Sequence, residues 1–426
     1  MNRVNISNIK RFLSLPKEVW IGWVSSLTEA YNMAIYSFIA PLLARLIFPL
    51  ESNSEAILFS YIIPFVGLGL LYPMGAIYYG FIGDKHGRQK TCVYSTLGLA
   101  IATGLMGFAP FEVLGDKSWL YFLILICAQN FFSGGEYYGS IVFSLEHTEQ
   151  KENGLMSSMS CLFAVFGLIF ANGLASLSIL TQNLLWIRIC FLIGALGGVI
   201  SYLLKNSCNE TPVFLEVSQD RHLLKKTEIF SFIKREWSKI LGVILILALF
   251  LVIYSFIFIF LPLIKINENG NETFDTFKSL FIYGAFLVFS GYASNLIGVK
   301  KVMLLGSFLL SLVLLSLGIL ETTDLMMMQI LLTIPACFII GPMHSWILNE
   351  FNANERCRGI FISSAIATSL FAGSTVPFCL VLHEYFNSLM VCCLCPLTFS
   401  VLSCFFLFKR SLKERNIQSE LDLLQS

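Results

Sequence analysis

The chain has 426 residues, of which 56% are hydrophobic and only 13% are charged. Soluble domains carry about 25% charged residues, so most of this chain cannot face water. The formal net charge is +1 and no basic stripe lies outside short loops, which argues against nucleic-acid binding.

The hydrophobic residues form long runs, and a membrane-spanning helix needs about 20 mainly apolar residues. Twelve such runs follow one another, and each is predicted to form one transmembrane helix. The runs cover residues 19–48, 56–81, 91–110, 119–146, 154–180, 184–204, 239–263, 276–297, 302–320, 326–348, 359–383 and 387–408. The expected fold class is therefore an all-α polytopic membrane protein.

Lysines and arginines agree with this count of spans. They gather at both termini and in every second loop, which the positive-inside rule assigns to the cytoplasm. The other side keeps only Arg45, Lys117, Lys265 and Lys278, and Arg188 falls within a span. Both termini are therefore predicted to be cytoplasmic.

One long polar stretch, residues 205–238, divides the spans into two sets of six. The predicted segments are an N-terminal six-helix bundle (1–204), a cytoplasmic linker (205–238), a C-terminal six-helix bundle (239–408) and a cytoplasmic tail (409–426). Lys205 counts here as the first residue of the linker. Within the linker, Thr211 followed by Pro212 predicts the start of a helix.

The loop after the second span holds the first tight cluster of charge, with two glycines that permit a tight turn. It reads Gly83-Asp84-Lys85-His86-Gly87-Arg88-Gln89-Lys90. Asp84 and Arg88 are predicted to hold the cytoplasmic ends of the bundles together, with the Asp84 carboxylate directed at a helix N-terminus. The second half echoes this pattern as Asn295-x-x-Gly298, which suggests an internal repeat.

Ionisable groups inside spans are informative because leaving a charge in lipid is costly. Glu29 in the first span and Glu136 in the fourth are deep carboxylates with no basic residue near them in sequence. Glu136 is predicted to carry a proton, because the neighbouring Gly134 and Gly135 allow another helix to approach closely and exclude water. The alternative is that Glu136 only accepts a hydrogen bond from a neighbouring helix.

Other polar groups lie on the same spans. Asn32 and Tyr36 share a helical face after Glu29, and these three are predicted to orient the substrate. His344 lies late in the tenth span. Charges near helix ends, at Glu146, Arg188 and Glu350, are either gating residues or structural partners of loop bases and helix ends.

These motifs, in this order, resemble the metabolite:proton symporters of the major facilitator superfamily, and among them the proline/betaine osmolyte symporters. The resemblance runs from Glu29 to the last span. Its anchors are Glu29-Ala30-Tyr31-Asn32 with Tyr36 and Phe38, the loop 83–90, the stretch 129–139, Glu146 before Gly154, Trp186-x-Arg188 and Glu210-Thr211-Pro212.

The chain departs from that pattern at three places. Asn32 stands where the family has an aspartate, and Ile126 stands before Gln129 where a basic residue is usual. The loop of the second half has Asn295 in place of an aspartate and lacks the arginine. Two candidate charges of the cavity are therefore missing.

The resemblance implies the major facilitator fold, with two pseudo-symmetric six-helix bundles around a cavity lined by spans 1, 4, 7 and 10. The candidate substrate and proton pathway is Glu29, Asn32, Tyr36, Gln129, Asn130, Glu136, Tyr137 and His344. The candidate gating residues are Gly83, Asp84, Gly87, Arg88, Glu146, Arg188, Glu350 and Arg358.

The expected function is proton-coupled import of a small polar metabolite by alternating access, in a bacterial cytoplasmic (inner) membrane. An osmolyte such as proline or betaine, or an organic acid, is the expected substrate. An uncoupled facilitator, an efflux carrier and a non-transporting receptor remain alternatives. No enzymatic motif appears, so no catalysis, cofactor or metal is expected. The expected partners are the substrate, protons and the lipid bilayer, with no nucleic acid, and the expected state is a monomer.

Overall fold

The computed structural model describes residues 14–47, 66–181, 183–219, 229–265, 272–320 and 324–425. Within these ranges all regular secondary structure is helical. A helix satisfies the hydrogen-bonding groups of its own backbone, which a segment surrounded by lipid requires.

The helices before the linker are called the N half below. They are α2 (Lys17–Ile47), η1 and α4 (Gly67–Leu71 and Tyr72–His86), α5 (Arg88–Gly107), α7 (Ser118–Leu145), α8 (Asn153–Thr181) and α9 (Leu184–Asn206). Short turns, α6 (Phe111–Leu114), η2 (Gly115–Lys117) and η3 (Gln150–Glu152), join some of them. Helix α2 packs against α7, α8 and α9, and α5 packs against α7 and α9.

The helices after the linker are called the C half. They are α11 with η5 and α12 (Ile229–Ser255, Phe256–Phe260 and Leu261–Lys265), α13 (Glu272–Ile297), α14 (Val299–Leu320), α15 (Leu325–Leu348), α16 with η6 and α17 (Arg356–Ala367, Thr368–Ala372 and Thr375–Phe386), and α18 (Leu389–Gln425). Segments η1, η5 and η6 are π-helical turns, a distortion that often marks functional positions in helices.

The linker contains α10 (Pro212–Gln219), which begins where the sequence predicts it. The Thr211 hydroxyl accepts a hydrogen bond from the Phe214 backbone N–H at 3.2 Å, as an N-cap residue does. The predicted cap at Thr211 is therefore confirmed.

In the described part of the chain these elements make twelve helical passes, one for each predicted span. Eight helices, the first of them containing α8, are long and apolar enough to cross a membrane by length and composition alone. The remaining passes, α2, η1 with α4, α5 and α7, carry much of the polar chemistry described below. Residues 48–65, which include the start of the predicted second span, lie outside the described residues.

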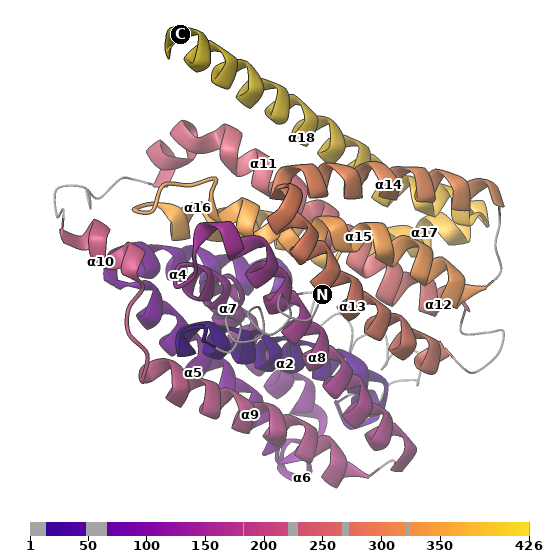
Figure 1. Cartoon of the computed structure of the whole chain (residues 1–426). Coiled ribbons are helices and arrows are strands. Elements are labelled where there is room, and N and C mark those ends of the chain that lie inside the picture. The colour runs from indigo at the N-terminus through magenta and orange to yellow at the C-terminus, as the bar shows by residue number, and fades with distance from the viewer. Residues whose placement is uncertain are drawn as a thin grey trace, which may run out of the picture.

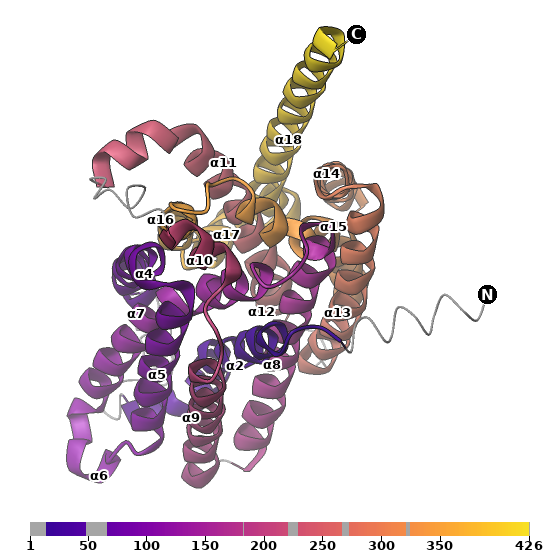
Figure 2. The ribbon, with the colours of Figure 1, turned by 60° about the vertical axis from the view of Figure 1, so that its left-hand side comes forward.

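The two halves meet along two seams. Helix α4 packs against α16, and α8 packs against α13 and α15. Figure 1 shows the N half, coloured indigo to magenta, beside the C half, coloured pink through orange to yellow. In both ribbon views the C-terminal end of α18 projects beyond the other helices (Figures 1 and 2).

Candidate functional site

Glu29 lies on α2 between the polar and aromatic side chains of several helices. Its Oε1 accepts a hydrogen bond from the Ser133 hydroxyl of α7 at 2.6 Å, and the residue is only 6% exposed. Among the described residues, no lysine or arginine lies within ion-pair distance of this carboxylate. A buried carboxylate without a cation is costly to keep charged, so Glu29 is a candidate for function.

Aromatic side chains from both halves occupy the space next to Ser133. Tyr137, one helical turn further along α7, brings its hydroxyl 3.4 Å from Nε2 of His344 on α15. The His344 ring contacts both Tyr137 and Tyr138, with centroid distances of 5.7 and 5.8 Å. This contact joins the predicted spans 4 and 10 across the two halves.

Further tyrosines belong to the same buried cluster. Tyr72 of α4 and Tyr283 of α13 share this cluster with Tyr138, and Phe258 of η5 packs against it. The Phe258 ring lies 5.4 Å from the ring of Tyr283. Tyr72, Tyr137 and Tyr138 interact electrostatically with Glu29. Glu29, these three tyrosines, Tyr283 and His344 are called the central site below.

Glu136 has a cation partner that does not lie near it in sequence. Its Oε1 lies 2.5 Å from Nζ of Lys205, and both side chains are fully buried. This pair is not apparent in the sequence, because the apolar run ends at Leu204 and Lys205 reads as the first linker residue, whereas α9 continues to Asn206 and holds Lys205 inside the N half. The pairing favours the charged form of Glu136, which opposes the predicted binding of a proton there.

Hydroxyl groups from three helices, α2, α5 and α7, complete the Glu136–Lys205 pair. Glu136 accepts hydrogen bonds from Ser25 at 2.7 Å and from Ser95 at 2.9 Å. Lys205 donates to Thr96 and to Ser140, each at 2.8 Å. The pair is therefore enclosed by α2, α5, α7 and α9 and is a polar core of the N half.

Four other candidates of the pathway also lie in the packing of the N half. Asn32 donates to the Gly194 carbonyl at 3.3 Å, and Gln129 donates to the Asn32 carbonyl and the Thr103 hydroxyl, each at 3.0 Å. Asn130 donates to the carbonyl of Ile126, one turn back in α7. Tyr36 packs in an apolar cluster, with its ring 6.4 Å from Phe122. The structure does not bring these four side chains to His344.

Asp84 joins the two halves at the end of α4. Its Oδ1 accepts the backbone N–H of Cys357 at 3.0 Å, and its Oδ2 accepts the backbone N–H and the Nε–H of Arg358, both at 3.0 Å. These N–H groups belong to the first turn of α16, where a helix has unpaired donors and a favourable dipole for an anion. Asp84 therefore caps a helix of the opposite half.

Arg88 and Glu146 extend this contact. Arg88 donates through Nε to Glu146 at 3.2 Å, through Nη1 to the Gly83 carbonyl at 3.0 Å, and through Nη2 to the Ala353 carbonyl of the C half. Glu146 also accepts from Arg356 of α16 at 2.7 Å. Asp84, Arg88, Glu146, Arg356 and Arg358 are called the ionic cluster below.

The linker is attached to the ionic cluster through two of its residues. Thr211 donates its hydroxyl to Glu146 at 2.6 Å. Glu210 accepts the backbone N–H groups of Arg88 and Gln89 at 3.0 and 3.2 Å, so it caps the N-terminus of α5. Burial raises the pKa of the Glu210 carboxyl, although these backbone hydrogen bonds oppose the shift.

Gly87 makes this arrangement possible. Its φ of 111° with ψ of 155° is a conformation that only glycine adopts readily. A Cβ atom at this position would lie 1.9 Å from Oε2 of Glu210. The glycine therefore lets the carboxylate reach the start of α5.

A second, weaker bridge crosses the other seam. Asn295 at the end of α13 accepts the backbone N–H of Leu155, at the start of α8, at 3.1 Å. This is the pseudo-symmetric counterpart of Asp84 on α16, but the acceptor here is a neutral amide. One crossing is thus held by charge, whereas the other is held by uncharged hydrogen bonds, this one and that from the Ser157 hydroxyl of α8 to the Gly341 carbonyl of α15 at 2.6 Å.

Two predicted gating residues lie apart from the ionic cluster. Arg188 donates to the carbonyl of Ala109, which follows the far end of α5. Glu350 pairs with Arg410 of α18 at 2.5 Å, within the C half. Burial raises the pKa of Glu350, and the nearby Arg410 opposes the shift.

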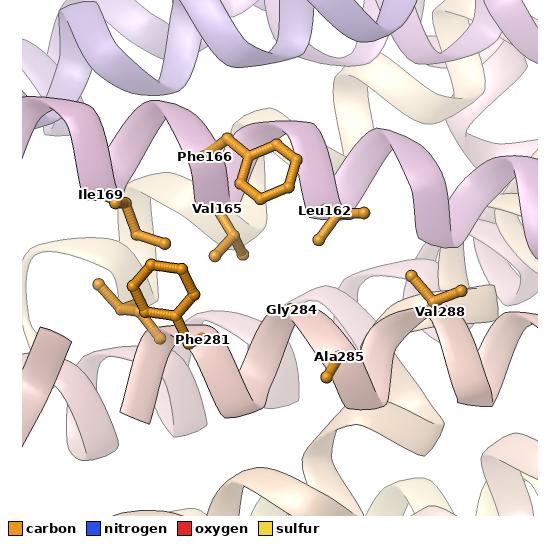
Figure 3. Close-up of a pocket in the computed structure, with 9 residues that line it drawn as sticks. Leu162, Val165, Phe166, Ile169, Phe281, Gly284, Ala285 and Val288 are labelled. Atoms are coloured by element: carbon orange, nitrogen blue, oxygen red, sulfur yellow. The ribbon is translucent and has the colours of Figure 1, made fainter. Parts of the chain in front are cut away.

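A groove of about 240 Å³ lies between α8 and α13. Figure 3 shows its walls, which carry only apolar side chains, with Phe166 and Leu162 on one helix and Phe281, Gly284 and Val288 on the other. Such a lining offers no hydrogen-bond partner to a polar substrate. The groove is therefore not part of the central site.

Comparison with known proteins agrees with this architecture. A profile of the Major Facilitator Superfamily matches residues 22–341. The chain is 31% identical over 212 residues to the proline/betaine transporter of Escherichia coli (strain K12), an alignment covering 47% of this chain and 41% of that protein. It thus spans less than half the length of that relative. An ectoine/proline transporter of Corynebacterium glutamicum is 25% identical over 386 residues, covering 83% of this chain and 75% of that protein.

Solved structures show the same fold. The proton:xylose symporter XylE superposes with a TM-score of 0.74 at 15% identity, over 92% of this chain and 95% of that one. The transporter FucP, in an outward conformation, gives a TM-score of 0.69 at 13% identity. With twelve helical passes and a matching profile over most of its length, the chain belongs to the major facilitator superfamily.

Proposed function

We propose that this protein imports a small zwitterionic osmolyte, coupled to protons, by alternating access. The observation that carries the proposal is the central site, where Glu29 and tyrosines lie between the two halves while the ionic cluster closes one end. Transporters of this type bind substrate near the bilayer midplane between their repeats. The relatives named for proline, betaine and ectoine support the substrate class.

The chemistry of the central site suits such a ligand. A carboxylate attracts an ammonium group, and aromatic faces attract quaternary ammonium through cation–π interactions. Glu29 supplies the carboxylate, and Tyr72, Tyr137 and Tyr138 supply aromatic surface beside it. The site therefore favours a cationic nitrogen over a sugar or an organic acid.

Glu29 is also the proposed proton-binding residue. Glu136 is neutralised by Lys205, so protonating it would leave a buried ammonium unpaired. Among the described residues, Glu29 has one hydrogen-bond partner, the Ser133 hydroxyl. Protonation of Glu29 would make the central site neutral. A site that is neutral when loaded can rearrange in lipid at lower cost than a charged one.

The proposed cycle rests on the ionic cluster. We infer that it lies on the cytoplasmic side, because the basic loops lie on that side, and that both termini are cytoplasmic. The contacts of Asp84 and Glu146 with α16 would hold that side closed and must break before substrate is released inward. The sequence predicts bundles at residues 1–204 and 239–408, with a linker 205–238 and a tail 409–426; because α9 continues to Asn206 and α11 begins at Ile229, the proposed bundles extend to those residues. The protein is proposed to act as a monomer in a bacterial inner membrane.

Uptake of labelled proline and glycine betaine into proteoliposomes tests the proposal. A pH gradient, acid outside, should drive accumulation above equilibrium, and a protonophore should abolish it. Uptake that ignores the gradient would indicate an uncoupled facilitator. Binding without flux would indicate a receptor, and export from oriented vesicles would indicate an efflux carrier.

A further inference from the structure

The central site must also hold the carboxylate of a zwitterion, and the deep basic residues of the described chain are committed elsewhere. Lys205 pairs with Glu136 inside the N half. Arg188 lies at the far end of the N half, on the Ala109 carbonyl. The position before Gln129, where related symporters carry a base, is Ile126. A carboxylate therefore needs another donor at the centre.

His344 offers that donor. It is 2% exposed and lies on α15, across the seam from α7. Its Nε2 faces the Tyr137 hydroxyl, and a hydroxyl that donates to Nε2 leaves the ring proton on Nδ1. Nδ1 has no hydrogen-bond partner among the residues that the structure describes. A buried donor without an acceptor is unfavourable, so an arriving anion would bind to it with a large gain.

Helix α7 links Glu29 to His344. Ser133 contacts Glu29, and Tyr137 contacts His344. Ser133 and Tyr137 are four residues apart, so they share one face of α7 with a rise of about 6 Å between them. Glu29 and His344 are therefore each held by a residue on neighbouring turns of the same face of α7.

We propose that His344 binds the substrate carboxylate through Nδ1–H, while Glu29 binds the ammonium end. This assignment rests on the proposed function. It names His344 as the residue that selects for the carboxylate of the substrate. Because His344 belongs to the C half and Glu29 to the N half, one zwitterion would join the two halves. A ligand with only one of these charged groups would engage only one half.

The test compares two variants at one position and two ligands. His344→Asn keeps an N–H donor near the Nδ1 position, and His344→Leu removes it. Glycine betaine carries the carboxylate, and choline carries the same trimethylammonium group without it. Gln329→Leu, which alters a buried polar residue on the same helix remote from His344, is the matched control. Each purified protein is checked for a single folded species before affinities are measured.

Wild type should prefer glycine betaine to choline, and His344→Leu should lower that preference about tenfold or more through weaker glycine betaine binding. His344→Asn and Gln329→Leu should keep most of the preference. An unchanged preference in His344→Leu, or an equal loss for both ligands, overturns the role of His344 and leaves the proposed function standing. Absence of binding of proline and glycine betaine to wild type overturns the proposed function and this assignment together.

Discussion

Lys205 Nζ lies 2.5 Å from Glu136 Oε1 inside the N half, and neither side chain reaches solvent. Hydroxyls of Ser25, Ser95 and Thr96 complete the hydrogen bonding of the carboxylate. Because of this pairing, the two deep carboxylates, Glu136 and Glu29, have different roles. The charge of Glu136 is compensated by Lys205 within the N half. Glu29 belongs to the central site and has no cation partner among the described residues.

The first prediction concerns this pair. Lys205→Met leaves Glu136 as an uncompensated buried charge and should destabilise the protein by about 3–5 kcal/mol. Combining it with Glu136→Gln should restore most of that loss, because no unpaired charge remains. Chemical unfolding in mild detergent measures both. Lys301→Met, at an exposed position, should change stability by about 0.5 kcal/mol or less, and equal losses in the single and double variants would contradict the pairing.

The second prediction concerns Asp84. Asp84→Asn removes the charge that caps α16 and pairs with Arg358, so the two halves should separate more often at this end. Cys357, whose N–H donates to Asp84, is 1% exposed and reports on this opening. Its alkylation, followed by mass spectrometry, should accelerate in the variant. Cys92, buried within the N half, should stay protected in both proteins, and an unchanged rate at Cys357 would mean that Asp84 does not hold the closure.

The third prediction concerns the hydrogen bond between Asn295 of α13 and the backbone of Leu155 on α8. Asn295→Asp places a carboxylate at the N-terminus of α8, where the helix dipole stabilises it by about 0.3–1 kcal/mol. The closed arrangement should become more populated, so transport should slow and alkylation of Cys357 should decrease. Faster alkylation in this variant would show that Asn295 does not act in parallel with Asp84.

The fourth prediction concerns the turn before α5. Gly87→Ala forces a side chain into a conformation that costs about 1–3 kcal/mol, and it also displaces Glu210 from the helix start. The variant should lose stability by at least that amount in thermal unfolding. Gly173→Ala on α8, where no neighbouring atom lies within 4 Å of the added carbon, is the control and should be neutral or slightly stabilising.

Much of this architecture could be predicted from the sequence. Long apolar runs and the placement of lysines and arginines determine how many helices form, because lipid tolerates few unpaired charges and no unpaired backbone groups. The cap at Thr211 could be predicted because the interaction is local, between Thr211 and Phe214. The loop pattern also indicated that Asp84 would meet a helix N-terminus, although not which helix.

The central site could be predicted only in part. Glu29, Tyr137 and His344 were candidates as polar groups inside spans, and the structure brings them to one region. Glu136 was misjudged because its partner is 69 residues away in sequence. Hydropathy also placed Lys205 at a helix end, where a lysine ordinarily faces water. Pairing across such separations depends on how helices pack, which no local pattern records.

The measurement that tests the central claim most directly is uptake by Glu29→Gln in proteoliposomes, with labelled proline as the substrate. The variant should lose accumulation driven by a pH gradient and keep exchange between equal internal and external pools, because the amide permanently mimics the protonated acid. The Glu136→Gln, Lys205→Met double variant should retain accumulation above equilibrium. Accumulation that survives in Glu29→Gln, or that disappears in the double variant while its fold is intact, would contradict the assignment of proton coupling to Glu29.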